Sequence, residues 1–151
     1  MLTIISVGKD HDPAFKEAIS LFENRLGHYS KFSWLLIKPS GYDGQKARVE
    51  ESEKILNVIS PQDFVVVLDE NGALASSPDI ASLIESCQNN SMKIVLVIGG
   101  AYGIDQTILA RANKAISFGR VVFPHQLVRI MVLEQLYRAH SILAGSNYHH
   151  E

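Results

Sequence analysis

The segment 124–145 carries four titratable side chains at a spacing that suits chemistry on a helix. His125 and Arg129 are four residues apart, and so are Glu134 and Arg138, so each pair would share one helix face. An acid four residues before a base is also an ordinary surface ion pair. The rest of the segment is apolar, however, and charged groups in such surroundings must be paired or must face a cleft or an interface. Both pairs are therefore candidate functional residues.

The chain ends in SNYHHE, which places Tyr148, His149 and His150 close to the terminus. One interpretation is a frayed tail or the remnant of an expression tag. The other interpretation is that the tail folds back and completes a site. The two histidines also resemble half of a metal site, but adjacent side chains point in different directions and no cysteine or acidic cluster is near in sequence. We predict no metal.

Glycines follow two predicted strands, in VIGGAYG and in ISFG. Glycine lets the backbone approach a ligand closely, although a tight turn explains GGAYG when it is taken alone. The fingerprints G-x-G-x-x-G, Walker, HExxH and G-x-S-x-G are absent, which argues against dinucleotide, P-loop, zinc-peptidase and serine-hydrolase sites. The single cysteine, Cys87, lies in a helical pattern and is interpreted as structural.

Apolar runs and amphipathic segments alternate along the chain, which predicts an α/β fold with a mostly parallel sheet in one domain, residues 1–151. The predicted strands are 2–8, 31–39, 64–68, 93–103 and 114–119, and the predicted helices are 12–29, 45–59, 76–90, 105–113 and 124–145. An acidic, glycine-containing loop is expected after Leu68. Ligands of such sheets bind beyond the carboxyl ends of the strands. Three ends stand out, at residues 68–70, 98–103 and 117–124.

The last predicted helix is apolar nearly all round, from Leu127 to Leu143. A surface helix would show one apolar stripe, so we expect one side to face the sheet and another to face a second subunit. The net charge of −2 argues against a general nucleic-acid coat protein. The C-terminal part is the more basic one, since residues 105–151 hold five Lys/Arg, three Asp/Glu and four of the six histidines. No signal peptide or membrane-spanning run is evident, and one cysteine fits a cytoplasmic protein.

Taken together, VIGGAYG, ISFGRVVFPHQLVRIMVLEQLYRA and the terminal NYHHE resemble the RlmH family. These are ribosomal large-subunit pseudouridine N3-methyltransferases of the SPOUT superfamily. The likeness covers essentially the whole chain, including the LDENG loop. It implies a SPOUT-type sheet flanked by helices with a deep C-terminal trefoil knot, a feature that is exceptional among folds.

The resemblance also implies a pocket for S-adenosylmethionine, released as S-adenosylhomocysteine, where the ends of the third, fourth and fifth strands meet. Backbone groups there would bind adenine and ribose, and Leu68, Val122 and Leu127 would supply apolar walls. The expected cofactor-binding residues are Leu68, Gly99, Gly100, Gly103, Gly119, Arg120, Val121, Val122, Phe123, Pro124 and Leu127.

In the family the tail belongs to the active site, and Tyr148 and His149 match it, whereas His150 stands where Lys or Arg is usual. We expect His149 to transfer a proton, because imidazole titrates near neutrality. Tyr148 is expected to stack on the target base, a common device in RNA recognition. Arg138 is expected to bind the uracil carbonyls or a nearby phosphate.

The remaining titratable residues are expected to support these. Glu134 would orient Arg138 rather than act as a base. His125 and Arg129 would position the cofactor loop or the RNA. The expected RNA-binding residues are Arg129, Arg138, Tyr148 and His149.

The resemblance implies a homodimer through the last helix, and 23S rRNA of the assembled 70S ribosome as substrate, with no membrane partner. Three alternatives stay open. They are another SPOUT specificity such as transfer RNA methylation, a non-enzymatic adenosyl-ligand or ribosome-binding module, and a phosphate-binding α/β enzyme that uses the backbone of residues 99–103.

Overall fold

The computed structural model describes residues 2–149, and these form strands and helices in strict alternation. The strands are β1 (Leu2–Val7), β2 (Phe32–Ile37), β3 (Phe64–Leu74), β4 (Ile94–Ile98) and β5 (Lys114–Ser117). The helices are α1 (Pro13–Gly27), α2 (Gly44–Leu56), α3 (Ser77–Asn89), α4 (Gln106–Arg111) and α5 (His125–Leu143). The α/β order predicted from the sequence is confirmed.

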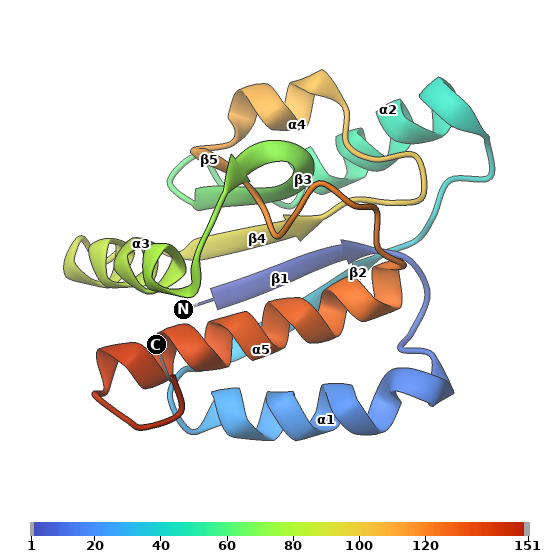
Figure 1. The fold of residues 1–151 in the computed structure, drawn as a ribbon. Helices are drawn as coiled ribbons and strands as arrows, with labels where there is room; N and C mark the ends of the chain where they lie inside the picture. Colours follow the sequence, from blue (N-terminus) through green and yellow to red (C-terminus); the bar gives the residue numbers. More distant parts are fainter. Residues whose placement is uncertain (1, 150–151) are drawn as a thin grey trace.

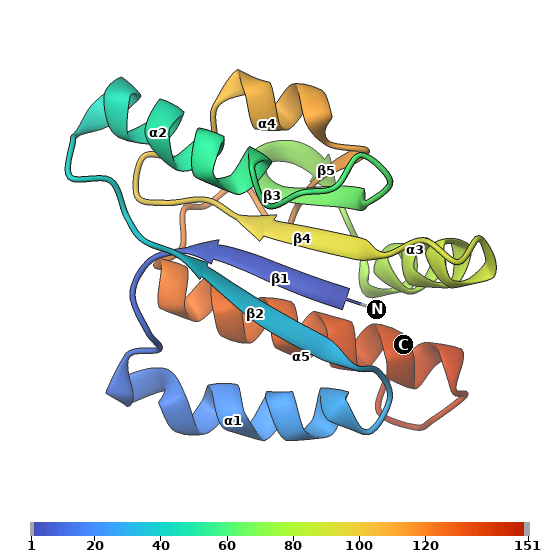
Figure 2. The ribbon, with the colours of Figure 1, turned by 180° about the vertical axis from the view of Figure 1, so that it is seen from behind.

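All five strands pair in parallel in one sheet, in the order β2-β1-β4-β3-β5. Helices α1, α3 and α5 cover one face of the sheet, and α2 and α4 cover the other (Figure 1, Figure 2). Leu2 and Ile4 of β1 pack toward the first layer, and Ile5 and Val7 pack toward the second. Strands covered on both faces are apolar at nearly every position, which explains the continuous apolar runs.

Local signals in the sequence fix where two of the helices begin. The Asp12 side chain accepts a hydrogen bond of 2.8 Å from the Ala14 backbone N–H, and Pro13 occupies the first turn of α1. At α3, Ser76 and Asp79 form a capping box. Such caps satisfy backbone donors that the first turn of a helix leaves unpaired.

Strand β3 differs from the prediction after Leu68. The chain leaves the sheet there, as expected of an acidic, glycine-containing loop, but it returns at Ala73 and pairs again with β5. Both Leu68 and Ala73 pair with Ile116, so the residues between them form an outward excursion. The return depends on pairing with a strand far along the chain, which no local pattern encodes.

Helix α5 lies between α1 and α3 on one face of the sheet (Figure 1). Its inward positions Val132, Leu133, Leu136 and Ala139 are at most 3% exposed. The sheet and two helices of the same chain therefore bury much of its apolar surface. None of the helices described is long and apolar enough to cross a membrane. The trefoil knot stays a prediction, because strand order and pairing do not establish the threading.

Candidate active site

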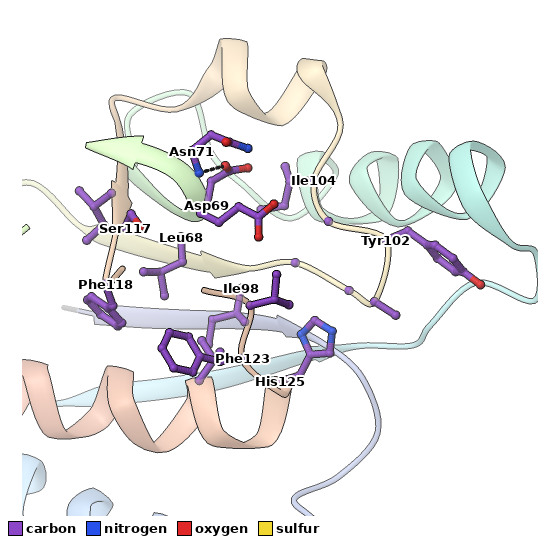
Figure 3. A pocket seen from close by; sticks show the side chains of 18 of the residues that line it. Leu68, Asp69, Asn71, Ile98, Tyr102, Ile104, Ser117, Phe118, Phe123 and His125 are labelled. Carbon is purple, nitrogen blue, oxygen red and sulfur yellow. Dashed lines mark hydrogen bonds between the residues drawn. The ribbon is translucent and has the colours of Figure 1, made fainter. Parts of the chain in front are cut away.

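A cavity of about 670 Å³ opens at the carboxyl edge of the sheet, where β3, β4 and β5 end (Figure 3). These are the three strand ends that the sequence singled out. The wall is made by residues 68–71, 98–104, 116–119 and 121–123, by His125 and Val128 of α5, and by Arg48, Gln106 and Leu109. The place is the usual one for a ligand of a parallel sheet, and the volume lies within the range of roughly 300–1,000 Å³ of small-molecule sites.

The glycine loop after β4 is a tight turn that α2 and the segment before it hold in place. Gly103, at φ +79°, donates its backbone N–H to the Gly100 carbonyl over 3.0 Å. The Tyr102 hydroxyl donates to Asp43 over 2.8 Å, and the Arg48 guanidinium donates to the Tyr102 carbonyl over 2.8 Å. The bond to Asp43 raises the pKa of Tyr102. These contacts fix the loop so that its backbone forms one wall of the cavity.

The segment between β5 and α5 forms the opposite rim. Arg120 donates to the carbonyl oxygens of Glu70 and Gly72 over 2.5 and 3.1 Å, which ties this segment to the excursion of β3. Val121 and Val122 are 61% and 81% exposed although they line the cavity. Exposed apolar side chains at a cavity rim suit a flat, partly apolar ligand.

A second cluster, here called the tail cluster, consists of Glu134, Arg138 and Tyr148. The Arg138 guanidinium donates to Glu134 Oε1 from Nε over 3.0 Å and from Nη2 over 2.6 Å. The Tyr148 hydroxyl donates to the same oxygen over 3.2 Å, and its ring lies 4.7 Å from the Arg138 guanidinium carbon. The hydrogen bond to Glu134 raises the pKa of Arg138. Burial, followed by the Glu134 charge, raises the pKa of Tyr148. The tail therefore folds back onto α5.

His149 follows Tyr148 and is half-buried. Within the described part of the chain its Nδ1 atom is buried and has no hydrogen-bond partner. His150, which stands where the family usually has Lys or Arg, lies outside the described range.

Within one chain, the cavity lies at the first turns of α5 and the tail cluster lies further along the helix. Helix α5 begins at the cavity with His125, and Arg138 follows 13 residues later, which corresponds to about 20 Å at 1.5 Å per residue. A single chain therefore separates the two groups of expected site residues.

Comparison with known proteins assigns this architecture to a family. A family model described as "Predicted SPOUT methyltransferase" matches residues 1–149. The chain is 36% identical to ribosomal RNA large subunit methyltransferase H of Christiangramia forsetii, over 99% of this chain and 98% of the relative. It is 40% identical to the protein of the same name from Caldicellulosiruptor saccharolyticus, over 99% of each chain.

The chain belongs to the SPOUT methyltransferase family. The resemblance stated from the sequence is thereby confirmed. Among solved structures, a probable methylase family protein from Haemophilus influenzae aligns with a TM-score of 0.60 at 13% identity, over 99% of this chain and 70% of that one. This likeness supports the fold.

Most of the expected cofactor-binding residues of this SPOUT methyltransferase line the cavity. They are Leu68, Gly99, Gly100, Gly103, Gly119, Val121, Val122 and Phe123. Three do not: Arg120 acts as the tie described above, Pro124 precedes the first turn of α5, and Leu127 is half-buried outside the lining. His125, expected to position the cofactor loop, lies in the wall itself.

Arg129, expected to contact RNA, lies inside the fold. Its side chain is fully buried and donates to Ser6 Oγ and to the Lys9 carbonyl, each over 3.0 Å, and lies 3.2 Å from His11 Nδ1. Burial lowers its pKa. In this SPOUT methyltransferase Arg129 therefore holds the segment after β1 against α5, and its expected role in RNA binding stays a prediction.

His125 is positioned one helical turn before Arg129. Burial, followed by the nearby Arg129 charge, lowers the pKa of His125, and Glu51 acts in the opposite direction. The imidazole is therefore neutral at pH 7 and adds no positive charge to the cavity wall.

The interpretation of the sequence missed Glu51, which is 5% exposed. A signal was present, because Ala47, Glu51 and Ile55 recur every four residues and so share the buried face of α2. A carboxylate in an apolar stripe must be paired or must face a cleft, as the charges of α5 must.

Proposed function

We propose that this chain is an S-adenosylmethionine-dependent methyltransferase that methylates N3 of a pseudouridine in 23S rRNA of the assembled 70S ribosome. The observation that carries the proposal is that the family motifs IGGAYG and SFGRVVFPH form two walls of one cavity. Relatives that match the full length are named ribosomal RNA large subunit methyltransferase H. This substrate places the enzyme in the cytoplasm.

The residues of the cavity suit S-adenosylmethionine. The glycine loop offers backbone donors and acceptors without side chains in front of them, which suits hydrogen bonding to adenine and ribose. Leu68, Val122 and Phe123 supply apolar surface. The cofactor provides an electrophilic methyl group, so no metal is needed for its transfer.

The tail cluster provides the groups that the acceptor base requires. The N3 imide must lose its proton while nitrogen attacks the methyl carbon, and cationic donors favour the resulting anion. Glu134 holds Nε and Nη2 of Arg138, which directs the remaining Nη1 edge toward carbonyl or phosphate oxygens. His149, whose Nδ1 has no partner in the described range, is our candidate for accepting the proton, and Tyr148 for stacking on the base.

A homodimer through α5 follows from the separation of cavity and tail cluster. Leu127, Met131, Glu134 and Arg138 are partly exposed and are spaced 4-3-4, so they form one stripe along the helix. If two such stripes pack antiparallel, the tail cluster of one subunit reaches the cavity of the other. The active site is then composite, with cofactor residues from one chain and RNA-facing residues from its partner.

The test is methyl transfer from labelled S-adenosylmethionine to 70S ribosomes that lack the modification, with mass-spectrometric mapping of the labelled nucleotide. We expect label on a large-subunit pseudouridine, and much less label on free 23S rRNA, because the low net basicity favours a preassembled target over naked RNA. Equal rates on both substrates, or label on transfer RNA, would contradict the proposed substrate.

A further inference from the structure

Glu51 is a buried carboxylate of α2 with one unused oxygen. Its Oε1 accepts the Ser40 backbone N–H over 2.8 Å, whereas Oε2 is buried and has no hydrogen-bond partner within residues 2–149. An ionised oxygen in this state costs free energy unless a positive group compensates it. Arg129, the other fully buried charge named above, donates from Nε and Nη1 to Ser6 and Lys9, and its Nη2 atom is also buried without a partner in the described range.

Gly100 separates this carboxylate from the cavity. A Cβ atom on Gly100 would collide with Glu51 Oε2, so the oxygen lies directly behind the glycine. Gly100 itself lines the cavity, together with its neighbour Gly99. Because Gly100 has no side chain, the carboxylate can lie against the backbone of a residue that lines the ligand space, with Val7 beside it.

The other titratable groups of this wall are partly exposed or neutral. Arg48, which donates to the Tyr102 carbonyl, is partly exposed, so water screens its positive charge. His125 is in the wall beside the glycine loop (Figure 3), and its lowered pKa leaves it uncharged at pH 7. Asp69 and Glu70 lie in the wall at the end of β3 but are partly or fully exposed, so water screens them. The field of a buried charge is screened much less.

We propose that the Glu51 carboxylate attracts a cationic group of S-adenosylmethionine, its sulfonium or its α-ammonium, across the gap left by Gly100. The inference rests on the proposed function, because it takes this cofactor as the ligand. It makes Glu51 a residue that selects for the charge of the cofactor, beside the backbone groups that recognise its adenosine part.

Isothermal titration calorimetry with three ligands tests the proposal. S-adenosylmethionine carries both cationic groups, S-adenosylhomocysteine carries only the ammonium, and methylthioadenosine carries neither. In the variant Glu51→Gln the remaining carbonyl oxygen still accepts the Ser40 N–H, so only the charge is removed. The matched control is Glu50→Gln, which removes the same charge from the neighbouring, partly exposed residue that pairs with Lys54 over 2.5 Å.

We expect Glu51→Gln to weaken S-adenosylmethionine binding about tenfold, equivalent to about 1.4 kcal/mol, with methylthioadenosine unchanged. A larger loss for S-adenosylmethionine than for S-adenosylhomocysteine identifies the sulfonium as the target. Equal losses for these two identify the ammonium. Glu50→Gln should change none of the three affinities by more than about twofold.

Two results would overturn the inference while leaving the proposed function intact. One is an equal loss for all three ligands, which would mean that Glu51 only shapes the loop, and the other is no loss at all. Failure of the wild-type chain to bind S-adenosylmethionine would overturn the inference and the proposed function together. If Glu51→Gln does not fold, Glu51→Asp keeps the charge but withdraws it from Gly100, and it should reduce the preference for S-adenosylmethionine over methylthioadenosine. An unchanged preference in that variant would also overturn the inference.

Discussion

Arg138 is held in a fixed orientation, as its proposed role in catalysis requires. Two of its nitrogens are bound to Glu134, and the Tyr148 ring lies 4.7 Å from its guanidinium carbon. A guanidinium group held in this way loses little rotamer freedom when it also binds an oxygen of the substrate. Lysine cannot reproduce the bidentate contact, although it keeps the charge.

We therefore expect Arg138→Lys to lower kcat for methyl transfer by about 10²-fold, the size of effect seen when one preorganised donor is lost. Cofactor affinity should stay unchanged, because in the proposed composite site Arg138 contacts the RNA and not the cofactor. Single-turnover methylation and calorimetry measure the two quantities. Arg25→Lys is the control, since Arg25 lies over Tyr137 in the same region without bonding Glu134. A loss of equal size in both variants would contradict the special role of Arg138.

At the scale of elements, the tail packs on α5 and not on the cavity. Tyr148 packs on Tyr137 with ring centroids 4.6 Å apart and bonds Glu134, so the tail is anchored on α5. None of the tail residues up to His149, the last one that the structure describes, lines the cavity. Cofactor binding and methyl transfer should therefore be separable.

A chain truncated after Gly145 should bind S-adenosylhomocysteine within about twofold of the full chain and should transfer no methyl group to 70S ribosomes. Calorimetry and label incorporation check the two halves of this prediction, and thermal unfolding confirms that the truncated chain is folded. Methylation at the rate of the full chain would return the tail to the interpretation of a frayed end.

The order of the elements could be predicted because each apolar run is long enough to be distinguished as a strand from the amphipathic helices around it. The return of β3 at Ala73 could not, since it depends on pairing with β5 across the excursion. The strand ends that form the cavity followed from the parallel topology alone. The role of the tail came from the family resemblance, because no periodicity places Tyr148 against Glu134. The full burial of Arg129 could not be predicted, since a charge on an apolar helix fits a buried anchor as well as a cleft.

At the scale of the whole molecule, the decisive fact is the distance between cavity and tail cluster along α5. If methyl transfer needs both the cavity and the tail cluster, either a second subunit must supply one of them or the chain must rearrange. Closed two-fold symmetry gives each subunit the same surface and creates two equivalent composite sites. This arrangement predicts complementation between subunits.

Mixing a cavity variant, Val122→Arg, with a tail variant, Arg138→Ala, should restore about a quarter of the wild-type activity, since half of the random dimers then carry one intact site of two. Each variant alone should be nearly inactive. Co-expression with two different affinity tags followed by label incorporation measures the recovery. If activity stays at the level of the separate variants, each site is built within one chain.

The place of α5 in the core bears on how the protein is made. Residues of this last helix complete the layer between α1 and α3, and β1 at the start of the chain pairs with β4. During synthesis the part of this face between α1 and α3 stays uncovered until α5 has left the ribosome. Exposed apolar surface of this kind promotes aggregation, so nascent chains that lack α5 should depend on chaperones. The core of this domain therefore closes only when its last helix packs between two helices that were made long before it.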